Sequence, residues 1–285
     1  MKLPFVLASR FVAGETLEQA LPVVEGLLDE GLHVTLDLLG EDVDDRVKAA
    51  RLTDSYISLT RRLADFRAGR DANISIKLSM IGQVIDEGFC QDNLRRLLDV
   101  ARESDTFVRL DMEGSSLTQS TLGILEAVYP DYPETVGTVL QAMLRRTDAD
   151  VARMCELRAR TRLVKGAYRE PEGIAYQDMP AIRERFRQSM QRLLVDGRYP
   201  AIATHDDELI NATKAFAGER GVSPRDFEFQ MLYGIRTETQ RQLAAEGYNM
   251  RVYVPYGTEW FPYFSRRLRE RKENVGFVLR NLVKR

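Results

Sequence analysis

Cysteine and histidine are both scarce in this sequence. Its 285 residues include only two cysteines, Cys90 and Cys155, and two histidines, His33 and His205. The two cysteines form no CxxC motif and no Cys/His spacing typical of zinc sites, so we expect neither a disulfide framework nor a metal. This usage of cysteine favours a reducing, cytoplasmic setting.

Long apolar runs are missing as well. No stretch approaches the roughly 20 apolar residues that a membrane-spanning helix needs. The N-terminal MKLPFVLASRF is briefly apolar, as a signal peptide would be, but the run is short and no clean small-residue cleavage site follows it. We therefore expect a cytoplasmic protein, and any membrane contact to be peripheral, at the inner face.

An excess of charge of one sign is also absent. Lys plus Arg number 41 and Asp plus Glu number 43, which gives a formal net charge of −2. This balance argues against a chain dominated by nucleic-acid binding, and we expect no nucleic-acid partner. The sequence has no GxGxxG and no Walker A loop, which argues against a Rossmann-type nucleotide site.

No low-complexity linker or solenoid repeat divides the chain, so we expect one domain over residues 1–285. A short strand pattern followed by an amphipathic helical pattern does recur. Strands are expected at His33–Leu39, Asn73–Met80, Phe107–Glu113, Val136–Ala142, Thr161–Ala167, Ala201–His205, Phe227–Leu232 and Arg251–Pro255. Helices are expected, for example, at Asp44–Arg67, Gln91–Arg102, Pro180–Val195, Asp206–Arg220 and Thr237–Glu246. Eight such alternations predict an α/β fold and favour closure into a barrel, with a doubly wound open sheet as the alternative.

The expected strand Phe107–Glu113 has one polar face. Arg109, Asp111 and Glu113 alternate with apolar residues, and Lys77 lies on a similar polar face of the strand expected at residues 73–80. In a barrel the apolar face meets the outer helices and the polar face lines the interior. Charged groups there are costly unless they are paired or bind a ligand, so we expect a site at the barrel mouth.

Three charged residues lie toward the carboxyl ends of expected strands: Lys77, Asp111 and Lys165. Active sites of α/β barrels are built at these ends. Lys77 and Asp111 could instead form a structural salt bridge across the barrel. Lys165 is followed by Gly166 and Ala167, a turn with little side-chain bulk that can approach a phosphate closely.

Two further segments carry polar groups that suit a ligand. ATHD, residues 203–206, ends a strand, and its Thr and His offer hydrogen bonds. His205 could instead be a structural interior residue, and Asp206 or Asp207 a helix cap. Near the C-terminus, Arg266 and Arg267 are adjacent on an expected helix, with Glu270 one turn on. Adjacent arginines can clasp a carboxylate, or simply form a solvated basic face.

Taken together, these segments resemble the proline dehydrogenase family, including its monofunctional bacterial members and the matching domain of bifunctional proline utilisation enzymes. The matching motifs run in family order from about residue 70 to the C-terminus: ISIKLS, VRLDME, VLQAML, RLVKGAY, ATHD, FEFQMLYG and RVYVPYG…PYFSRRLRE…NVGFV. The resemblance implies a distorted (βα)8, TIM-like barrel with extra helices at the termini and non-covalently bound FAD. The match is poorest before residue 70, where relatives often carry extra helices, so the N-terminus could be short or truncated.

The resemblance also implies roles for individual residues. Arg162 would lie beside the flavin ring near N5, and Asp111 would organise the polar network of the active site. The implied cofactor contacts are Met112, Gln141, Arg162, Val164, Lys165, Gly166, Ala167, Thr204, His205 and Glu270. The implied substrate contacts are the carboxylate-binding Arg266 and Arg267, the assisting Lys77, and the walls Leu232, Tyr253 and Tyr263. Two positions depart from the family pattern: Asp206 replaces an Asn and Arg169 an aromatic residue, and both bear on how the cofactor is held.

The implied reaction is oxidation of L-proline to Δ1-pyrroline-5-carboxylate by hydride transfer from proline C5 to flavin N5, the first step of proline catabolism to glutamate. A membrane quinone would accept the electrons, and a pyrroline-5-carboxylate dehydrogenase could receive the product. The alternatives are a barrel lyase or aldolase with Lys165 as Schiff-base nucleophile, a flavin barrel of the methylenetetrahydrofolate reductase kind, and a binding protein without catalytic activity.

Overall fold

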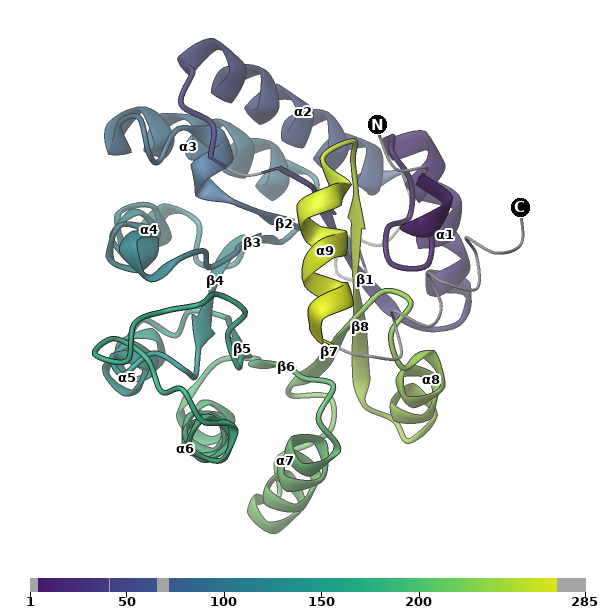
Figure 1. The fold of residues 1–285 in the computed structure, drawn as a ribbon, viewed down its shortest axis with the longest axis vertical. Helices are drawn as coiled ribbons and strands as arrows, with labels where there is room; N and C mark the ends of the chain where they lie inside the picture. Colours follow the sequence, from purple (N-terminus) through teal and green to yellow (C-terminus); the bar gives the residue numbers. More distant parts are fainter. Residues whose placement is uncertain (1–4, 41, 66–71, 271–285) are drawn as a thin grey trace.

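The computed structural model describes residues 5–40, 42–65 and 72–270, with side chains up to Arg267. Eight parallel strands within these ranges close into a barrel in chain order (Figure 1). They are β1 (His33–Leu38), β2 (Ala72–Ile76), β3 (Val108–Leu110), β4 (Val136–Gln141), β5 (Thr161–Val164), β6 (Ala201–Ala203), β7 (Glu228–Leu232) and β8 (Asn249–Tyr256). Because β1 pairs with both β2 and β8, the predicted barrel is confirmed and the open sheet is wrong.

Most helices form a ring outside the barrel (Figure 1). Those that follow strands are α2 (Arg46–Ala64), α3 (Glu87–Glu103), α4 (Ser115–Val128), α5 (Thr147–Leu157), α6 (Met179–Asp196), α7 (Asp207–Arg220) and α8 (Thr237–Ala245). Short 3-10 helices lie at η1 (Phe5–Leu7), η2 (Leu78–Ile81) and η3 (Tyr129–Asp131). Several α-helices begin at a side-chain cap, as where Asp45 accepts from Lys48 N at 2.6 Å.

The two terminal helices distort this plan. Helix α1 (Leu17–Asp29) precedes β1 and packs against β1 and β8, at the outer position where a helix after β8 would ordinarily lie. In the view of Figure 1, helix α9 (Trp260–Glu270), which does follow β8, lies over the barrel within the ring of outer helices. The predicted extra helices at the termini are therefore present, and α9 is free to contribute side chains to the barrel opening.

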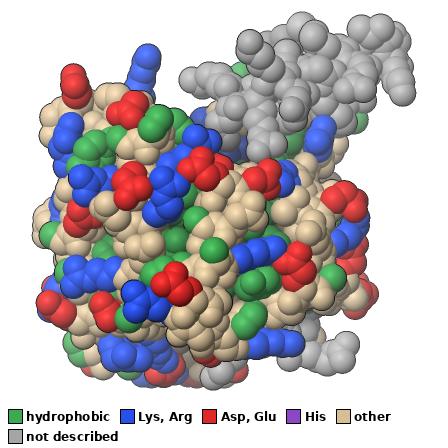
Figure 2. Space-filling model, turned by 90° about the horizontal axis from the view of Figure 1, so that it is seen from below, with side chains coloured by type: hydrophobic (Ala, Val, Ile, Leu, Met, Phe, Trp, Pro, Cys, Tyr) green, Lys and Arg blue, Asp and Glu red, His purple; other side chains and the backbone are tan. Residues whose placement is uncertain are grey.

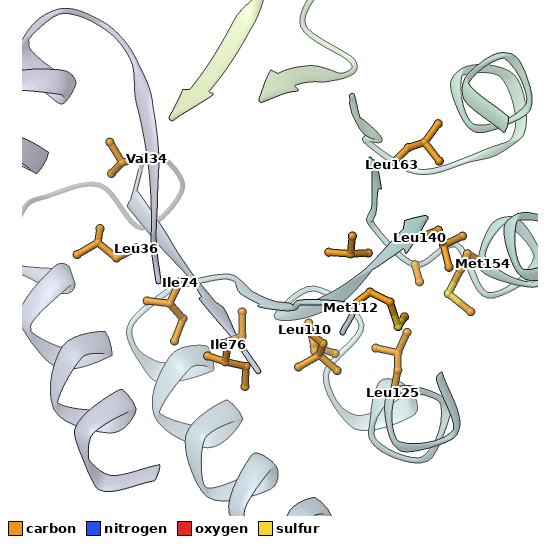
Figure 3. Close-up of a cluster of buried hydrophobic side chains, with 14 of the residues drawn as sticks. Val34, Leu36, Ile74, Ile76, Leu110, Met112, Leu125, Leu140, Met154 and Leu163 are labelled. Atoms are coloured by element: carbon orange, nitrogen blue, oxygen red, sulfur yellow. The ribbon is translucent and has the colours of Figure 1, made fainter. Parts of the chain in front are cut away.

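The apolar faces of the strands build the core between barrel and helices. Figure 3 shows Ile74, Ile76 and Leu110 pointing outward from their strands, and Leu140 near Met154 of α5. These side chains are fully or almost fully buried. Burial of each such chain contributes about 1.5–3 kcal/mol. The strand alternation read from the sequence thus sorts the two faces correctly.

The interior of the barrel carries buried charges. Glu228 and Arg251 form an ion pair at 3.1 Å, and Arg251 Nη1 donates to Val34 O at 2.7 Å. Arg109 Nη1 donates to Thr138 O at 3.1 Å. We call Arg109, Glu228 and Arg251 the barrel floor. The guanidinium of Arg109 fits because position 137 is a glycine, where an added Cβ would lie 3.0 Å from Arg109 Nη1.

Three strands end at least three residues before their predicted carboxyl ends. The strand expected at Asn73–Met80 stops at Ile76 and turns into η2, and the strand expected at Thr161–Ala167 stops at Val164. The one expected at Phe107–Glu113 spans only Val108–Leu110. Residues 77–80 and 111–113 stay buried past the ends of β2 and β3, so the sequence keeps a strand-like pattern although the backbone has left the hydrogen-bonded ladder. Residues 165–167 after β5 are partly buried or exposed.

A second, smaller core holds α9 against the N-terminal segment. Phe11, Trp260 and Phe264 are buried there, with Phe11 and Phe264 ring centroids 6.4 Å apart. Trp260 Nε1 donates to Glu15 Oε1 at 3.1 Å. The position of α9 therefore depends on contacts with residues 5–15, which lie far away in sequence.

The surface seen in Figure 2 shows acidic and basic side chains interspersed over one face. This agrees with the balanced composition. None of the helices in the described ranges is both long and apolar enough to span a bilayer. The one-domain assignment for residues 1–285 stays a prediction.

Candidate active site

A cavity of about 810 Å³ opens at the carboxyl ends of the strands, with α9 along one side. Its size lies within the range of small-molecule and cofactor sites, roughly 300–1,000 Å³. Every site residue predicted from the sequence lines this cavity except Glu270. The side chain of Glu270 and the NVGFV motif lie outside the described part of the chain.

Asp111 is the centre of a polar triangle in the cavity. Its Oδ1 accepts from Arg162 Nη1 at 2.5 Å, and its Oδ2 accepts from Tyr253 Oη at 2.7 Å. Arg162 also donates to Ser75 Oγ at 2.9 Å, and its guanidinium lies 5.3 Å from the Tyr253 ring centroid. Burial, reinforced by the Asp111 carboxylate, raises the pKa of Tyr253 well above its ordinary value, so this tyrosine stays a neutral donor.

Lys77 pairs with Asp37 rather than with Asp111. Lys77 Nζ lies 2.8 Å from Asp37 Oδ1, and both side chains are almost completely buried. Although burial lowers it, Asp37 and Asp111 together hold the pKa of Lys77 above its ordinary value, so the ammonium is charged. The alternative of a salt bridge between Lys77 and Asp111 is therefore wrong: each residue is half of a different ion pair.

Gln141 and Gly166 line the cavity from β4 and from the loop after β5. Gln141 Nε2 donates to Glu113 O at 3.2 Å, whereas its buried Oε1 has no hydrogen-bond partner among the described residues. Gly166 has φ +114°, and an added Cβ would lie 2.4 Å from Met143 Sδ. The chain after Val164 can therefore adopt this left-handed turn only with glycine at position 166.

The ATHD segment supplies a second group of polar atoms. His205 Nε2 accepts from Leu232 N at 3.0 Å, and Thr204 Oγ1 accepts from Asp206 N at 3.1 Å. Asp206 Oδ2 accepts from both Lys165 Nζ and Arg183 Nε, each at 2.8 Å. Asp206 also accepts from Glu208 N and so caps α7. One side chain thus both begins the helix and binds two cations of the cavity.

Helix α9 brings Tyr263, Arg266 and Arg267 to the cavity. Arg267 is buried, and its guanidinium carbon lies 5.3 Å from the Tyr263 ring centroid, within cation–π range. Arg266 is partly exposed. Two guanidinium groups at one cavity wall can bind the carboxylate of a small ligand.

Sequence reasoning missed several residues of this site. Asp37, Ser75 and Arg183 were not among the expected site residues, yet the first two contact Lys77 and Arg162, and Arg183 lines the cavity. Asp37 could have been found from the polar face Thr35/Asp37 of the first strand. Arg183 lies on a helix with many arginines, and no sequence signal separates it from its neighbours.

The described residues contain no group of three or more His, Cys, Asp or Glu side chains placed to hold a metal ion. The site offers paired charges, two arginine side chains from α9 that line the cavity, and a glycine turn next to a lysine. This combination suits an anionic substrate together with a phosphorylated cofactor.

Known proteins with similar sequences cover nearly the whole chain. It is 42% identical over 282 residues to a proline dehydrogenase of Deinococcus radiodurans, covering 98% of this chain and 90% of that protein. It is 41% identical over 278 residues to proline dehydrogenase 1 of Bacillus subtilis strain 168, covering 98% and 91%.

A solved structure shares the fold. Proline utilization A from Bdellovibrio bacteriovorus, inactivated by N-propargylglycine, superposes with a TM-score of 0.87 at 26% identity. The match covers 93% of this chain and 32% of that longer protein. The sequence model described as proline dehydrogenase matches residues 20–280. The chain belongs to the proline dehydrogenase family.

Proposed function

We propose that this proline dehydrogenase binds FAD and oxidises L-proline to Δ1-pyrroline-5-carboxylate at the cavity described above. The observation that carries the proposal is the convergence of two α9 arginines with the Asp111–Arg162–Tyr253 triangle in one cavity. The two arginines suit the carboxylate of an amino acid. The triangle provides charged groups in fixed positions next to the place where the reaction would occur.

The residues of the cavity fit a flavin nucleotide. Gln141 Oε1 is a buried acceptor with no partner among the described residues, and Gly166 provides a turn without side-chain bulk beside the charged Lys165. We propose that the cofactor is held by the residues that the family resemblance implies: Met112, Gln141, Arg162, Val164, Lys165, Gly166, Ala167, Thr204, His205 and Glu270. When bound, FAD supplies a two-electron acceptor that takes the hydride from proline C5 at its N5.

The substrate contacts would come from α9 and the strand ends. Arg266 and Arg267 would bind the carboxylate, with Lys77 adding positive charge. Leu232, Tyr253 and Tyr263 would form the walls around the pyrrolidine ring. Fixing a small substrate in this way places its reacting carbon at one position, and such orientation can lower a barrier by about 7–11 kcal/mol in ideal cases.

Asp111 would organise the site rather than remove a proton. Both of its oxygens already accept hydrogen bonds, one from Arg162 and one from Tyr253. This arrangement fixes Arg162, which would stabilise negative charge that develops next to it during the reaction. The amine of proline must be neutral for its lone pair to assist loss of hydride, so activity should rise with pH.

We also propose where the electrons and the product of the reaction go. Electrons would pass to a membrane quinone, and the product would pass to a pyrroline-5-carboxylate dehydrogenase on the route from proline to glutamate. The protein would act in the cytoplasm, with peripheral contact to the inner face of the membrane.

An absorption spectrum tests the core of the proposal. Purified protein, supplied with free FAD, should show a flavin spectrum that bleaches when proline is added without oxygen. A flavin that stays oxidised would contradict the proposal. The same sample, treated with borohydride and a carbonyl substrate, tests the lyase alternative, which needs a neutral Lys165. The ion pair of Lys165 with Asp206 speaks against that alternative.

A further inference from the structure

We propose that Asp206 sets the strength with which the protein holds the phosphate groups of its cofactor, because its carboxylate occupies the two cations that a phosphate would use. The inference rests on the proposed binding of FAD in this cavity. It assigns a role to Arg183, which was not among the expected site residues, and says how Asp206, a departure from the family pattern, would affect the hold on the cofactor.

The geometry places one carboxylate between two cations from different elements. Lys165 follows β5, Arg183 lies on α6, and Asp206 is the N-cap of α7. Asp206 Oδ2 lies 2.8 Å from Lys165 Nζ and 2.8 Å from Arg183 Nε. The Asp206 side chain is 10% exposed, against 28% and 33% for the two cations, and all three line the cavity. A phosphate can reach the cations, but it meets them already paired.

The charges around this cluster are nearly balanced. Arg183 also lies 3.4 Å from Glu208, and Arg187 and Arg236 pair with Glu208 and Asp207 at 2.5 Å each. The first turn of α7 therefore carries three carboxylates, including its cap. Helix N-termini ordinarily attract anions, but here the carboxylates of the first turn already interact favourably with the N-terminus of α7. An incoming phosphate gains less from this site than its cations alone would provide.

Asp206 keeps its negative charge at pH values near neutrality. Although burial raises it, hydrogen bonds from Lys165 and Arg183 lower the pKa of Asp206 to about 2. The competition with phosphate is therefore permanent and independent of pH near neutrality. Replacing the carboxylate with an amide of the same shape would remove the negative charge that Lys165 and Arg183 share, and would leave only the longer contact of Arg183 with Glu208.

The test is the rate at which FAD leaves the holoprotein after dilution, followed by the rise in flavin fluorescence. Asn caps helices as well as Asp does, so Asp206→Asn preserves the start of α7. We expect FAD release roughly three- to tenfold slower than in the unchanged protein, with a steeper dependence on salt. Gain of retention is informative, because damage to the fold would accelerate release.

Asp207→Asn is the matched control. Asp207 lies on the same turn and pairs with an arginine, Arg236, but its side chain is 70% exposed and it does not bind Lys165 or Arg183. Its release rate should slow much less than that of Asp206→Asn, because Asp207 lines the cavity but pairs with neither Lys165 nor Arg183. Asp206→Ser, which also retains a cap, repeats the test should the Asn variant fold poorly.

A second variant measures the competition directly. Arg183→Gln should accelerate FAD release only modestly when Asp206 is present and much more in the Asp206→Asn background, because Arg183 loses its closer carboxylate partner only in that background. Equal effects in both backgrounds, or release from Asp206→Asn as fast as or faster than from the unchanged protein, would overturn the role of Asp206. A protein that never takes up FAD would overturn the proposed function itself.

Discussion

The barrel floor and the barrel mouth both contain buried ion pairs, but only the mouth opens to the cavity. Glu228 and Arg251 in the floor pair with each other, and Arg251 also donates to a strand carbonyl. Asp37–Lys77 and Asp111–Arg162 at the mouth are paired just as closely, yet all four line the cavity. A buried charge pair in a barrel is therefore no sign of a site until the tertiary structure shows whether ligand can reach it.

The two regions should also respond differently to mutation. A buried pair stabilises the fold little relative to an apolar pair, but removal of one partner leaves an uncompensated charge. In the floor that loss appears as lower stability. At the mouth we expect it to appear as weaker binding or slower turnover, since the cavity admits water and ligand.

Glu228→Ala should have the largest effect on stability. It removes one partner of a buried ion pair, which should lower the free energy of unfolding by about 3–5 kcal/mol. Urea denaturation measures this. Glu30→Ala is the control, since the Glu30–Arg241 pair between α1 and α8 is well exposed and should cost no more than about 1 kcal/mol. Equal losses in both variants would refute the distinction between buried floor and surface.

Arg266→Ala should give the largest effect at the mouth. Loss of a charged partner for a carboxylate costs about 2–5 kcal/mol, so KM for proline should rise at least about 30-fold. The amount of bound flavin should not change, as its absorbance would show. Arg266→Lys keeps the charge but loses the bidentate geometry, so its KM for proline should lie between those of the unchanged protein and Arg266→Ala. An unchanged KM would remove Arg266 from the substrate site.

Gly166→Ala tests whether the turn after β5 contacts the cofactor at the barrel mouth. The residue has φ +114°, and its Cβ would press against Met143. We expect a loss of about 1–3 kcal/mol in stability together with faster FAD release. Gly173→Ala, in the same loop but with open space around the added Cβ and no positive φ, is the control. Normal flavin retention in Gly166→Ala would show that this turn does not touch the cofactor.

The smallest expected effect is a change in the stability of the barrel floor with pH. Although burial raises it, Arg251 lowers the pKa of Glu228 to about 2, below the ordinary value of 4.5. The stability that depends on this shift is complete above the ordinary value and is lost as pH falls toward 2, because the unfolded chain takes up the proton first. Urea midpoints of the unchanged protein and of Glu228→Gln should therefore converge between pH 5 and pH 3. A constant difference over that range would contradict the pairing.

Much of the fold could be predicted because the evidence for it is local. Alternation of apolar and polar residues in segments such as Val108–Asp111 shows which face meets the helices, and eight repeats of strand and helix favour a barrel over an open sheet. The ends of the strands were predicted less well. Leu78 and Met80 stay buried in a 3-10 helix, where the apolar pattern looks the same as in a strand.

The site was predicted as a set of residues but not as a set of contacts. Lys77, Asp111 and Arg162 were expected in one cavity, and they are there. Their partners were not foreseen: Asp37 comes from β1, 40 residues before Lys77, and Arg162 reaches Asp111 across 51 residues. Pairing across such distances depends on which strands become neighbours, and sequence spacing carries no information on it.

The sequence by itself determined the class of fold, the faces of its strands and, through ordered motifs, the family. These properties follow from periodicity and residue type, which act over a few neighbouring positions. Only the tertiary structure decided which buried charges face the cavity, that α1 displaces α9 to the barrel opening, and that Asp206 binds both Lys165 and Arg183. These depend on closure of the barrel, because only closure brings side chains from distant strands and helices within hydrogen-bonding distance.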